Sequence, residues 1–364
     1  MKIWKESVRL LLMSLFLIVA GCDSGANDEE PQAAVDVDLD ALFAPAQAAE
    51  LQSILDDWAQ RDISVQNLQE VASDTMSFTF GRQSVIRVVS HEVGSNTHYG
   101  AIVTPVGAAD ESLPVLVYNH GGDGGENVDQ TITLLSLGVD EIINQFIYVV
   151  PSFRDEPLTV NGMTYQSDGP ASPWDYDVDD ALALLNAALE STPAADPDRI
   201  GAFGFSRGGG VALLMGIRDP RIDLVSEFFG PTDFFVQDIR DTVVEALMGA
   251  PRDLPGMDFL NENYIQPLGE GTVSIAEARI EMIRRSPVLF ADLLPDVQIQ
   301  HGEIDDIVVV DHALSLSETL QDMGRDATQL ELHLYPNAGH SPLQMVGSFD
   351  RLVEFVNRLI EMPT

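Results

Sequence analysis

Lysine and cysteine are almost missing from this chain. Both lysines, Lys2 and Lys5, lie in the first ten residues, so arginine supplies all later permanent positive charge. Cys22 is the only cysteine, which excludes an intrachain disulfide. Cationic residues are scarce altogether: 19 Lys and Arg stand against 58 Asp and Glu, a formal net charge of −39. Such a surface repels nucleic acid and anionic lipid, because phosphate binding needs clustered cations.

A negative excess of this size also destabilises a folded chain through self-repulsion. In 1 M salt the screening length falls to about 3 Å, which removes most of that repulsion. Scarce lysine beside abundant Asp and Glu resembles the proteins of salt-loving organisms, so we expect a halophilic protein. An acidic secreted protein from an ordinary habitat is the alternative.

Long apolar runs are equally scarce, and the clearest one lies near the start of the chain. Residues 10–20 are apolar and follow a short basic region; the run is too short to span a bilayer but is typical of a signal peptide. It ends in VAGC, residues 19–22, which resembles the lipobox of bacterial lipoproteins and implies acylation of Cys22. We therefore expect a signal peptide over residues 1–21 and a protein held in the cell envelope, outside the cytoplasm, by a lipid anchor alone. A buried structural cysteine after an ordinary signal peptide is the alternative.

The rest of the chain divides into a polar segment and a long mixed one. Residues 22–45 are acidic and rich in alanine, which predicts a disordered tether. The folded domain is expected over residues 46–364, since 45% apolar residues are enough for a sizeable core. At its start, residues 46–60 place apolar side chains at helical spacing, which predicts a helix on the outside of the domain.

Two strand patterns follow one another along this domain. Alternation over residues 77–80, 84–93 and 98–106 predicts an antiparallel edge. From residue 113, short continuous apolar runs predict parallel strands buried on both faces, and their alternation with helices implies a doubly wound α/β sheet. The expected strands are residues 115–118, 146–150, 200–203, 224–229, 297–300 and 330–334, and the expected helices are residues 175–190, 206–217, 311–323 and 347–361.

Residues 234–287 interrupt this alternation. The segment has glycine and proline breaks and one helical stretch at 275–283. Connections elsewhere in the predicted sheet are short, and an insert this long is usually a lid or a binding loop. We therefore expect a helical lid at this position.

A serine motif lies between a predicted strand and a predicted helix. Residues 204–208, GFSRG, match G-x-S-x-G, which places a serine on a tight strand-to-helix turn. The glycines on either side of Ser206 avoid collision with the neighbouring strand or helix. The pentapeptide alone is equally compatible with a glycine-rich turn that does no chemistry, so the rest of the chain must supply the other parts of a site.

Those parts occur at the carboxyl ends of other strands, where an open α/β sheet places its ligand site. His340 follows the last predicted strand in a loop with glycine and is the best candidate for a general base. Glu303, Asp305 and Asp306, on the loop after another strand, compete to orient it through Nδ1. The chain order of serine, acid and histidine is that of α/β-hydrolases. We expect no metal and no cofactor, because no group of His, Asp or Glu has ligand spacing.

Glycine-rich turns also supply candidates for an oxyanion hole. Residues 120–122, HGG, follow a predicted strand, and N–H groups in such a turn can point at a carbonyl oxygen as it gains charge. The N–H of Arg207 is the second candidate donor, because it opens a helix. His120 is expected to brace the turn with a hydrogen bond. Since only the main chain of Arg207 has a role here, we expect its side chain to be dispensable.

From about residue 75 to its end, the chain resembles an α/β-hydrolase of the prolyl-oligopeptidase and dienelactone-hydrolase type. In such families the acid is the first Asp of H-G-x-x-D-x-x-V, which lands on Asp305 with Asp306 as the fallback, and the second glycine of H-G-G, here Gly122, donates to the oxyanion. The chain has no room for the β-propeller of the larger oligopeptidases and no recognisable acidic motif that grips a peptide N-terminus. The matching segments are residues 120–122 (HGG), 151–154 (PSFR), 174–180 (WDYDVDD), 204–209 (GFSRGG), 230–233 (GPTD), 286–287 (SP), 301–308 (HGEIDDIV) and 339–341 (GHS).

The resemblance implies a serine hydrolase that works through an acyl-enzyme. A carboxylic ester or lactone is the expected substrate, because a single domain with a lid needs no module that gates peptides. A small serine peptidase acting on short peptides is the first alternative. A catalytically inactive binding module on the same fold is the second.

Overall fold

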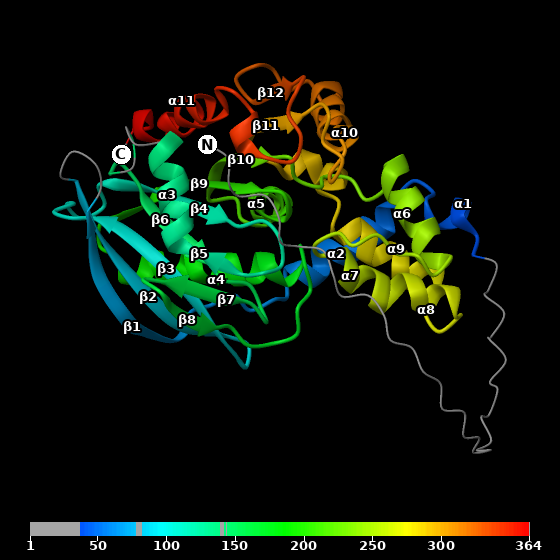
Figure 1. The fold of residues 1–364 in the computed structure, drawn as a ribbon, viewed down its shortest axis with the longest axis horizontal. Helices are drawn as coiled ribbons and strands as arrows, with labels where there is room; N and C mark the ends of the chain where they lie inside the picture. The colour runs from blue at the N-terminus through cyan, green and yellow to red at the C-terminus, as the bar shows by residue number, and fades with distance from the viewer. Residues whose placement is uncertain (1–36, 78–81, 139–141, 143, 364) are drawn as a thin grey trace, which may run out of the picture. The chain divides into compact units, whose positions relative to one another are not determined.

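The computed structural model describes residues 37–77, 82–138, 142 and 144–363, arranged around a nine-stranded sheet (Figure 1). The expected signal peptide, Cys22 and most of the expected tether lie outside the described residues. The last part of the tether is described and is folded: α1 (Leu39–Leu42) is a short helix, and Leu42 is fully buried. Arg279 of the insert donates to the carbonyl oxygen of Leu42 at 2.7 Å. The domain boundary expected at residue 45 is therefore too late.

Three antiparallel strands form one edge of the sheet. β2 (Gln83–Val93) and β3 (Asn96–Pro105) match the predicted strands, and β3 pairs antiparallel with β6 (Ile147–Pro151). β1 spans Gln66–Ser77, whereas the strand expected at 77–80 lies mostly outside the described residues. β1 is an edge strand with mostly exposed side chains, so no apolar alternation marks it in the sequence.

The other strands are parallel, as predicted. Their continuous apolar sequences suit burial on both faces. The full sheet order is β1-β2-β3-β6-β4-β9-β10-β11-β12. The remaining strands are β4 (Leu113–Asn119), β9 (Ala195–Phe205), β10 (Ile222–Phe228), β11 (Asp296–Gly302) and β12 (Leu330–Tyr335).

Alternate side chains of each central strand enter two separate cores. On β4, Val115 and Val117 belong to one core, and Leu116 and Tyr118 belong to the other. The first core includes side chains of α2 (Ala48–Trp58), α4 (Tyr176–Ser191), α5 (Arg207–Arg218) and α10 (Asp311–Asp322). The second includes side chains of α3 (Val128–Gly138) and α11 (Ser348–Glu361) (Figure 1).

The segment expected to be a lid is helical. It follows β10 and consists of short helices with a π-helical turn at Asn261–Ile265. Its last helix begins at a capping box in which Ser274 and Glu277 satisfy each other's main-chain N–H groups. Its helices are α6 (Gln237–Leu247), α7 (Met257–Leu260), α8 (Gln266–Gly269) and α9 (Ile275–Arg284).

Two further features complete the description. A small second sheet contains β5 (Glu126–Asn127), β7 (Pro157–Val160) and β8 (Met163–Gln166), and the sequence did not predict it. Among the helices that the structure describes, none combines the length and the apolar character needed to cross a bilayer.

Candidate active site

Ser206 lies between β9 and α5 in a strained backbone conformation. Its φ is 54° and its ψ is −123°, and positive φ is unfavourable for residues other than glycine. The two motif glycines make the turn possible. A Cβ on Gly204 would lie 2.2 Å from the carbonyl oxygen of Gly208, and one on Gly208 would lie 2.1 Å from that of Asn119. The steric reason predicted for these glycines is confirmed.

Ser206, His340 and Asp305 form a continuous chain of hydrogen bonds, although they follow three different strands. Nε2 of His340 lies 2.8 Å from Oγ of Ser206, and Nδ1 lies 2.8 Å from Oδ2 of Asp305. An imidazole with its proton on Nδ1 donates to the carboxylate and accepts from the serine hydroxyl. The ring of Phe229 lies against His340, with 4.5 Å between centroids, and supports its orientation. This arrangement is suited to removing the hydroxyl proton of Ser206.

Of the three candidate acids, Asp305 is the one that contacts His340. Its side chain is fully buried, whereas Glu303 and Asp306 are exposed. Oδ1 of Asp305 accepts the main-chain N–H groups of residues 307 and 308 at 2.9 and 3.1 Å. Burial acts to raise the pKa of Asp305, but the hydrogen bond and charge of His340 and the two amides outweigh it, so the pKa lies below its ordinary value. The carboxyl group is therefore ionised at neutral pH, as a partner of an imidazolium must be.

The HGG turn packs directly against the serine turn. A Cβ on Gly121 would lie 3.2 Å from the Cβ of Ser206 and 2.8 Å from the main chain before it, so the close approach needs glycine. Gly122 has a φ of 73°, in the left-handed region. Nδ1 of His120 donates to the carbonyl oxygen of Gly121 at 3.1 Å, which is the bracing bond that we expected. The N–H of Arg207 opens α5 and has no acceptor within that helix.

The side chain of Arg207 is fully buried and holds three groups together. Nε and Nη2 donate to the two carboxylate oxygens of Asp177 at 2.8 and 2.7 Å. Nη1 donates to Glu156 at 2.5 Å and to the carbonyl oxygen of Gly122 at 3.0 Å. Burial raises the pKa of Glu156 to about 7, against the lowering effect of the Arg207 charge. The structure overturns the expectation that this side chain is dispensable, because its removal would leave two buried carboxyl groups without their cation.

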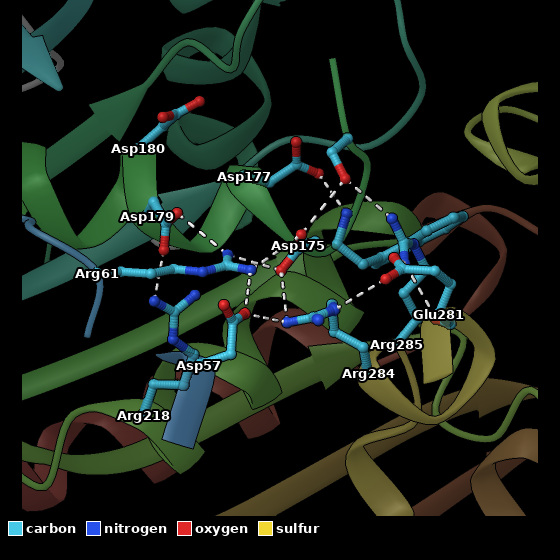
Figure 2. Close-up of polar contacts among 12 residues, drawn as sticks. Asp57, Arg61, Asp175, Asp177, Asp179, Asp180, Arg218, Glu281, Arg284 and Arg285 are labelled. Atoms are coloured by element: carbon cyan, nitrogen blue, oxygen red, sulfur yellow. Dashed lines mark hydrogen bonds and ion pairs between the residues drawn. The ribbon is translucent and has the colours of Figure 1, made fainter. Parts of the chain in front are cut away.

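A cluster of ion pairs continues from α4 to the base of the insert (Figure 2). Arg61, just after α2, donates to Asp57 and Asp175 at 2.7 Å each. Arg284 of α9 donates to Asp57 at 2.5 Å. Since Asp57 belongs to α2, Asp175 is the N-cap residue of α4 and Arg284 belongs to α9, the cluster ties the insert to the helices that cover the sheet. The other ion pairs drawn there are Arg61 with Asp179, Arg218 with Asp179, Arg284 with Asp175, Arg284 with Glu281, and Arg285 with Glu281.

A small cavity lies beside Ser206. Its volume is about 40 Å³. The walls come from the segment before α4, from the beginning and middle of the insert, from the loop after Asp305 and from the start of α10, so the insert helps to shape the site. The apolar wall residues are Trp174, Pro231, Phe234, Ile239, Leu254, Pro255, Met257, Ile307 and Val308.

A buried carboxyl group lies beneath the serine turn. Glu227, on β10, is fully buried, and its Oε2 accepts the N–H of Gly230 at 2.7 Å. A Cβ on Gly209, in the first turn of α5, would lie 3.3 Å from that oxygen. Among the described residues, Oε1 has no hydrogen-bond partner. Burial raises the pKa of Glu227 to about 8, against the opposing hydrogen bond of Gly230.

Four histidines that were expected to be structural lie on regular elements, and one of them, His312, also lines the cavity beside Ser206. His91 and His98 pack together across β2 and β3, and burial lowers their pKa values to about 4 and about 3. Nδ1 of His312 accepts the N–H groups of residues 232 and 233, and burial lowers its pKa to about 3. His333 lies on β12. Within the described part of the chain, no group of three or more His, Cys, Asp or Glu is arranged to hold a metal ion.

Sequence reasoning missed the positions of three supporting side chains. Trp174 and Asp177 lie in the WDYDVDD segment, which was interpreted only as a helix start. The sequence did contain a signal for this cluster: several acids lie beside a tryptophan. Acids that are buried need cations as partners. Nothing in the sequence indicated Glu156, whose contact with Arg207 joins residues 51 positions apart.

Comparisons with known proteins extend the description of the fold. No family model and no curated protein matches the sequence. Solved structures do match. Acetyl xylan esterase 1 from Thermoanaerobacterium sp. JW/SL YS485 is 18% identical, with 88% of this chain and 93% of that chain covered and a TM-score of 0.57. An acetyl xylan esterase from Paenibacillus sp. R4 is 17% identical, with 88% and 98% covered and a TM-score of 0.58.

A peptidase also matches. The acylaminoacyl peptidase of Pyrococcus horikoshii is 14% identical, with 77% of this chain and 49% of that chain covered and a TM-score of 0.51. At these identities the likeness concerns the fold alone. The mostly parallel nine-stranded sheet, its antiparallel edge, its flanking helices and these matches show that the chain has the α/β-hydrolase fold.

Proposed function

We propose that this protein is a serine hydrolase that cleaves a carboxylic ester or lactone. The observation that carries the proposal is the hydrogen-bonded chain from Ser206 through His340 to Asp305, at 2.8 Å for each step. Its serine lies on a strained turn at the start of a helix, where a hydroxyl can be presented to a substrate.

In the proposed mechanism, Nε2 of His340 takes the proton of Ser206 as Oγ attacks the carbonyl carbon. Asp305 holds the imidazole in the required tautomer and stabilises its positive charge. The N–H groups of Gly122 and Arg207 bind the oxyanion, and loss of one such donor typically lowers the rate by about 10²–10³. His340 then returns the proton to the leaving alcohol, and water hydrolyses the acyl-enzyme.

Support for an ester rather than a peptide comes from the extent of the structural matches. The matches with the two acetyl xylan esterases cover 93% and 98% of those chains, whereas the match with the acylaminoacyl peptidase covers 49% of that protein. The sequence also contains no recognisable acidic motif for a peptide N-terminus. The alternative is a small serine peptidase, and the experiment must distinguish it from an ester hydrolase.

The experiment compares p-nitrophenyl esters with aminoacyl p-nitroanilides in 1–3 M salt, using Ser206→Ala as the control. We expect ester turnover that Ser206→Ala abolishes, and labelling of the wild type by a fluorophosphonate probe. Turnover of amides alone would make the protein a peptidase. Absence of both turnover and labelling in folded protein would favour an inactive binding module.

We also propose that the protein is held at a membrane surface. The lipobox-like residues 19–22 support lipidation at Cys22 and a position at the surface of a membrane, outside the cytoplasm. Expression in a bacterial host should place the wild type in the membrane fraction. Cys22→Ser should release it to the soluble extracytoplasmic fraction, and a variant that stays with the membrane would contradict the lipid anchor.

A further inference from the structure

The cavity beside Ser206 lies on the acyl side of the reacting bond. Ser206 and Arg207 are among its described lining residues, and His340 is not. The leaving alcohol must approach Nε2 of His340 to receive a proton, whereas the oxyanion must approach the N–H of Arg207. A cavity next to the serine and the oxyanion donor therefore receives the acyl group.

The size of this cavity limits what enters it. A volume of about 40 Å³ accommodates about three water-sized groups. That is enough for the alkyl part, beyond the carbonyl carbon, of an acetyl, propionyl or butyryl group. A hexanoyl or longer chain would extend beyond this volume.

The wall at Trp174 is held from several sides. Its main-chain N–H donates to Oδ2 of Asp177 at 2.8 Å, and its φ is 60°. Buried Arg285, at the end of the insert, donates to the carbonyl oxygen of Pro173 at 2.9 Å. A Cβ on Gly256 would lie 2.7 Å from the indole ring, so main chain of the insert packs directly on the tryptophan. Figure 2 shows both Arg285 and Asp177.

The neighbouring part of the wall is fixed in the same way. Phe234 packs edge-on against Trp174, with 5.2 Å between ring centroids. Its N–H donates to Oγ of Ser286 at 2.9 Å. Leu254 and Met257 line the cavity from the insert, and Ile307 and Val308 line it from the loop after Asp305. The main chain at Trp174 and Phe234 is tied to buried polar partners, which opposes movement of this part of the wall.

The surroundings of His340 differ. Its side chain is 20% exposed, and the neighbouring loops carry Ile304 and Leu343, which are 64% and 69% exposed. The alcohol part of an ester therefore meets an open, partly apolar edge. We propose, on the basis of the proposed hydrolase function, that the substrates are esters of short acyl groups, from acetyl to butyryl, and that Trp174, Leu254 and Met257 set this limit.

The test is a series of p-nitrophenyl esters from acetate to decanoate, which share one leaving group, so differences in kcat/KM report the acyl site. We expect kcat/KM to fall by at least about tenfold between butyrate and hexanoate, because misfit by one methylene already costs about tenfold or more. Met257→Ala should move this fall to longer chains and raise the activity on hexanoate relative to acetate. Leu254→Ala, at a partly exposed position, is the second variant if Met257→Ala folds poorly.

Met282→Ala is the matched control. Met282 is equally buried in the insert but does not line the cavity, so its replacement should lower stability without changing the preference for chain length. Octanoate hydrolysed as well as acetate would overturn the short-acyl proposal and leave the hydrolase proposal intact. An unchanged profile in both cavity variants would overturn the assignment of the wall. If the protein hydrolyses no ester at all, both the proposed function and this inference are wrong.

Discussion

Nη1 of Arg207 donates a hydrogen bond to the carbonyl oxygen of Gly122 at 3.0 Å. The residue after the proposed nucleophile therefore fixes, through its side chain, the turn expected to supply the second oxyanion donor. The same guanidinium is held by Asp177, whose Oδ2 also accepts the N–H of Trp174. One buried cation thus connects the oxyanion turn with the wall of the acyl cavity.

Replacing Arg207 by methionine tests this connection. Arg207→Met leaves Asp177 and Glu156 buried without their cation, and breaking a buried pair from one side typically costs about 3–5 kcal/mol. We expect the free energy of unfolding in urea to fall by about that amount, with a loss of kcat.

Arg252→Met is the control for Arg207→Met. Arg252 pairs with Asp238 and Glu245, and its side chain is one-third exposed, so its loss should cost at most about 1 kcal/mol. If both substitutions lower the free energy of unfolding by the same small amount, the buried cation of Arg207 contributes no more to stability than the partly exposed one of Arg252.

The assignment of Asp305 gives a second prediction. Asp305→Asn removes the carboxylate that orients Nδ1 of His340, and we expect kcat for p-nitrophenyl acetate to fall by about 10²–10⁴. Asp306→Asn, at the exposed neighbouring position, should keep nearly full activity. The reverse pattern would transfer the role to Asp306.

Glu227 gives a prediction about pH. Its pKa is raised to about 8 in the folded state against an ordinary value of 4.5, so between these values the folded chain keeps a proton that the unfolded chain has released. Stability attributable to this group therefore falls as pH rises through that window. Glu227→Gln removes the effect, and the stability of the variant relative to wild type should increase from pH 5 to pH 8, by an amount on the order of a few kcal/mol.

Urea unfolding at several pH values measures the effect of Glu227→Gln. Glu303→Gln, at an exposed carboxylate, is the comparison and should shift stability by an amount that does not vary over this range. A difference between Glu227→Gln and wild type that stays constant from pH 5 to pH 8 would mean that Glu227 is ionised in the folded protein.

The net charge of −39 gives a prediction about salt. Because screening at molar salt removes repulsion between exposed carboxylates, Tm should rise from dilute buffer to 2 M NaCl. At pH 4 about half of the exposed carboxylates are protonated, so the rise should be smaller there. A Tm at neutral pH that stays constant or falls would count against a halophilic protein.

The parts of the fold that the sequence predicted are those with a strong apolar pattern. β4 is a continuous apolar strand, since both of its faces are buried, and its predicted bounds were close to those observed. β9 begins at Ala195, well before the expected residue 200, and this beginning was missed because its first residues, ADPDR, are mostly polar. β1, at Gln66–Ser77, was not predicted, because an exposed edge strand has no such pattern. α3 was not predicted, since its sequence VDQTITLLSLG is rich in residues that favour helices only weakly.

The same distinction holds for the site. Ser206, His340 and a short range of acids could be predicted because the ends of parallel strands meet at one edge of the sheet. The selection of Asp305, independent of family resemblance, required coordinates, since Glu303 and Asp306 lie on the same loop. The roles of Arg207 and Glu156 could not be predicted, because contacts between distant segments leave no local pattern.

The left-handed backbone of Ser206 lowers the stability of the fold relative to a glycine at the same position. Residues in such conformations typically lower stability by about 1–3 kcal/mol, and a glycine would adopt the same φ almost freely. A binding protein with no catalytic role would be more stable with glycine at this position. Under the proposed function, the hydroxyl group of Ser206 is the reason that this position holds a residue less stable than glycine in this conformation.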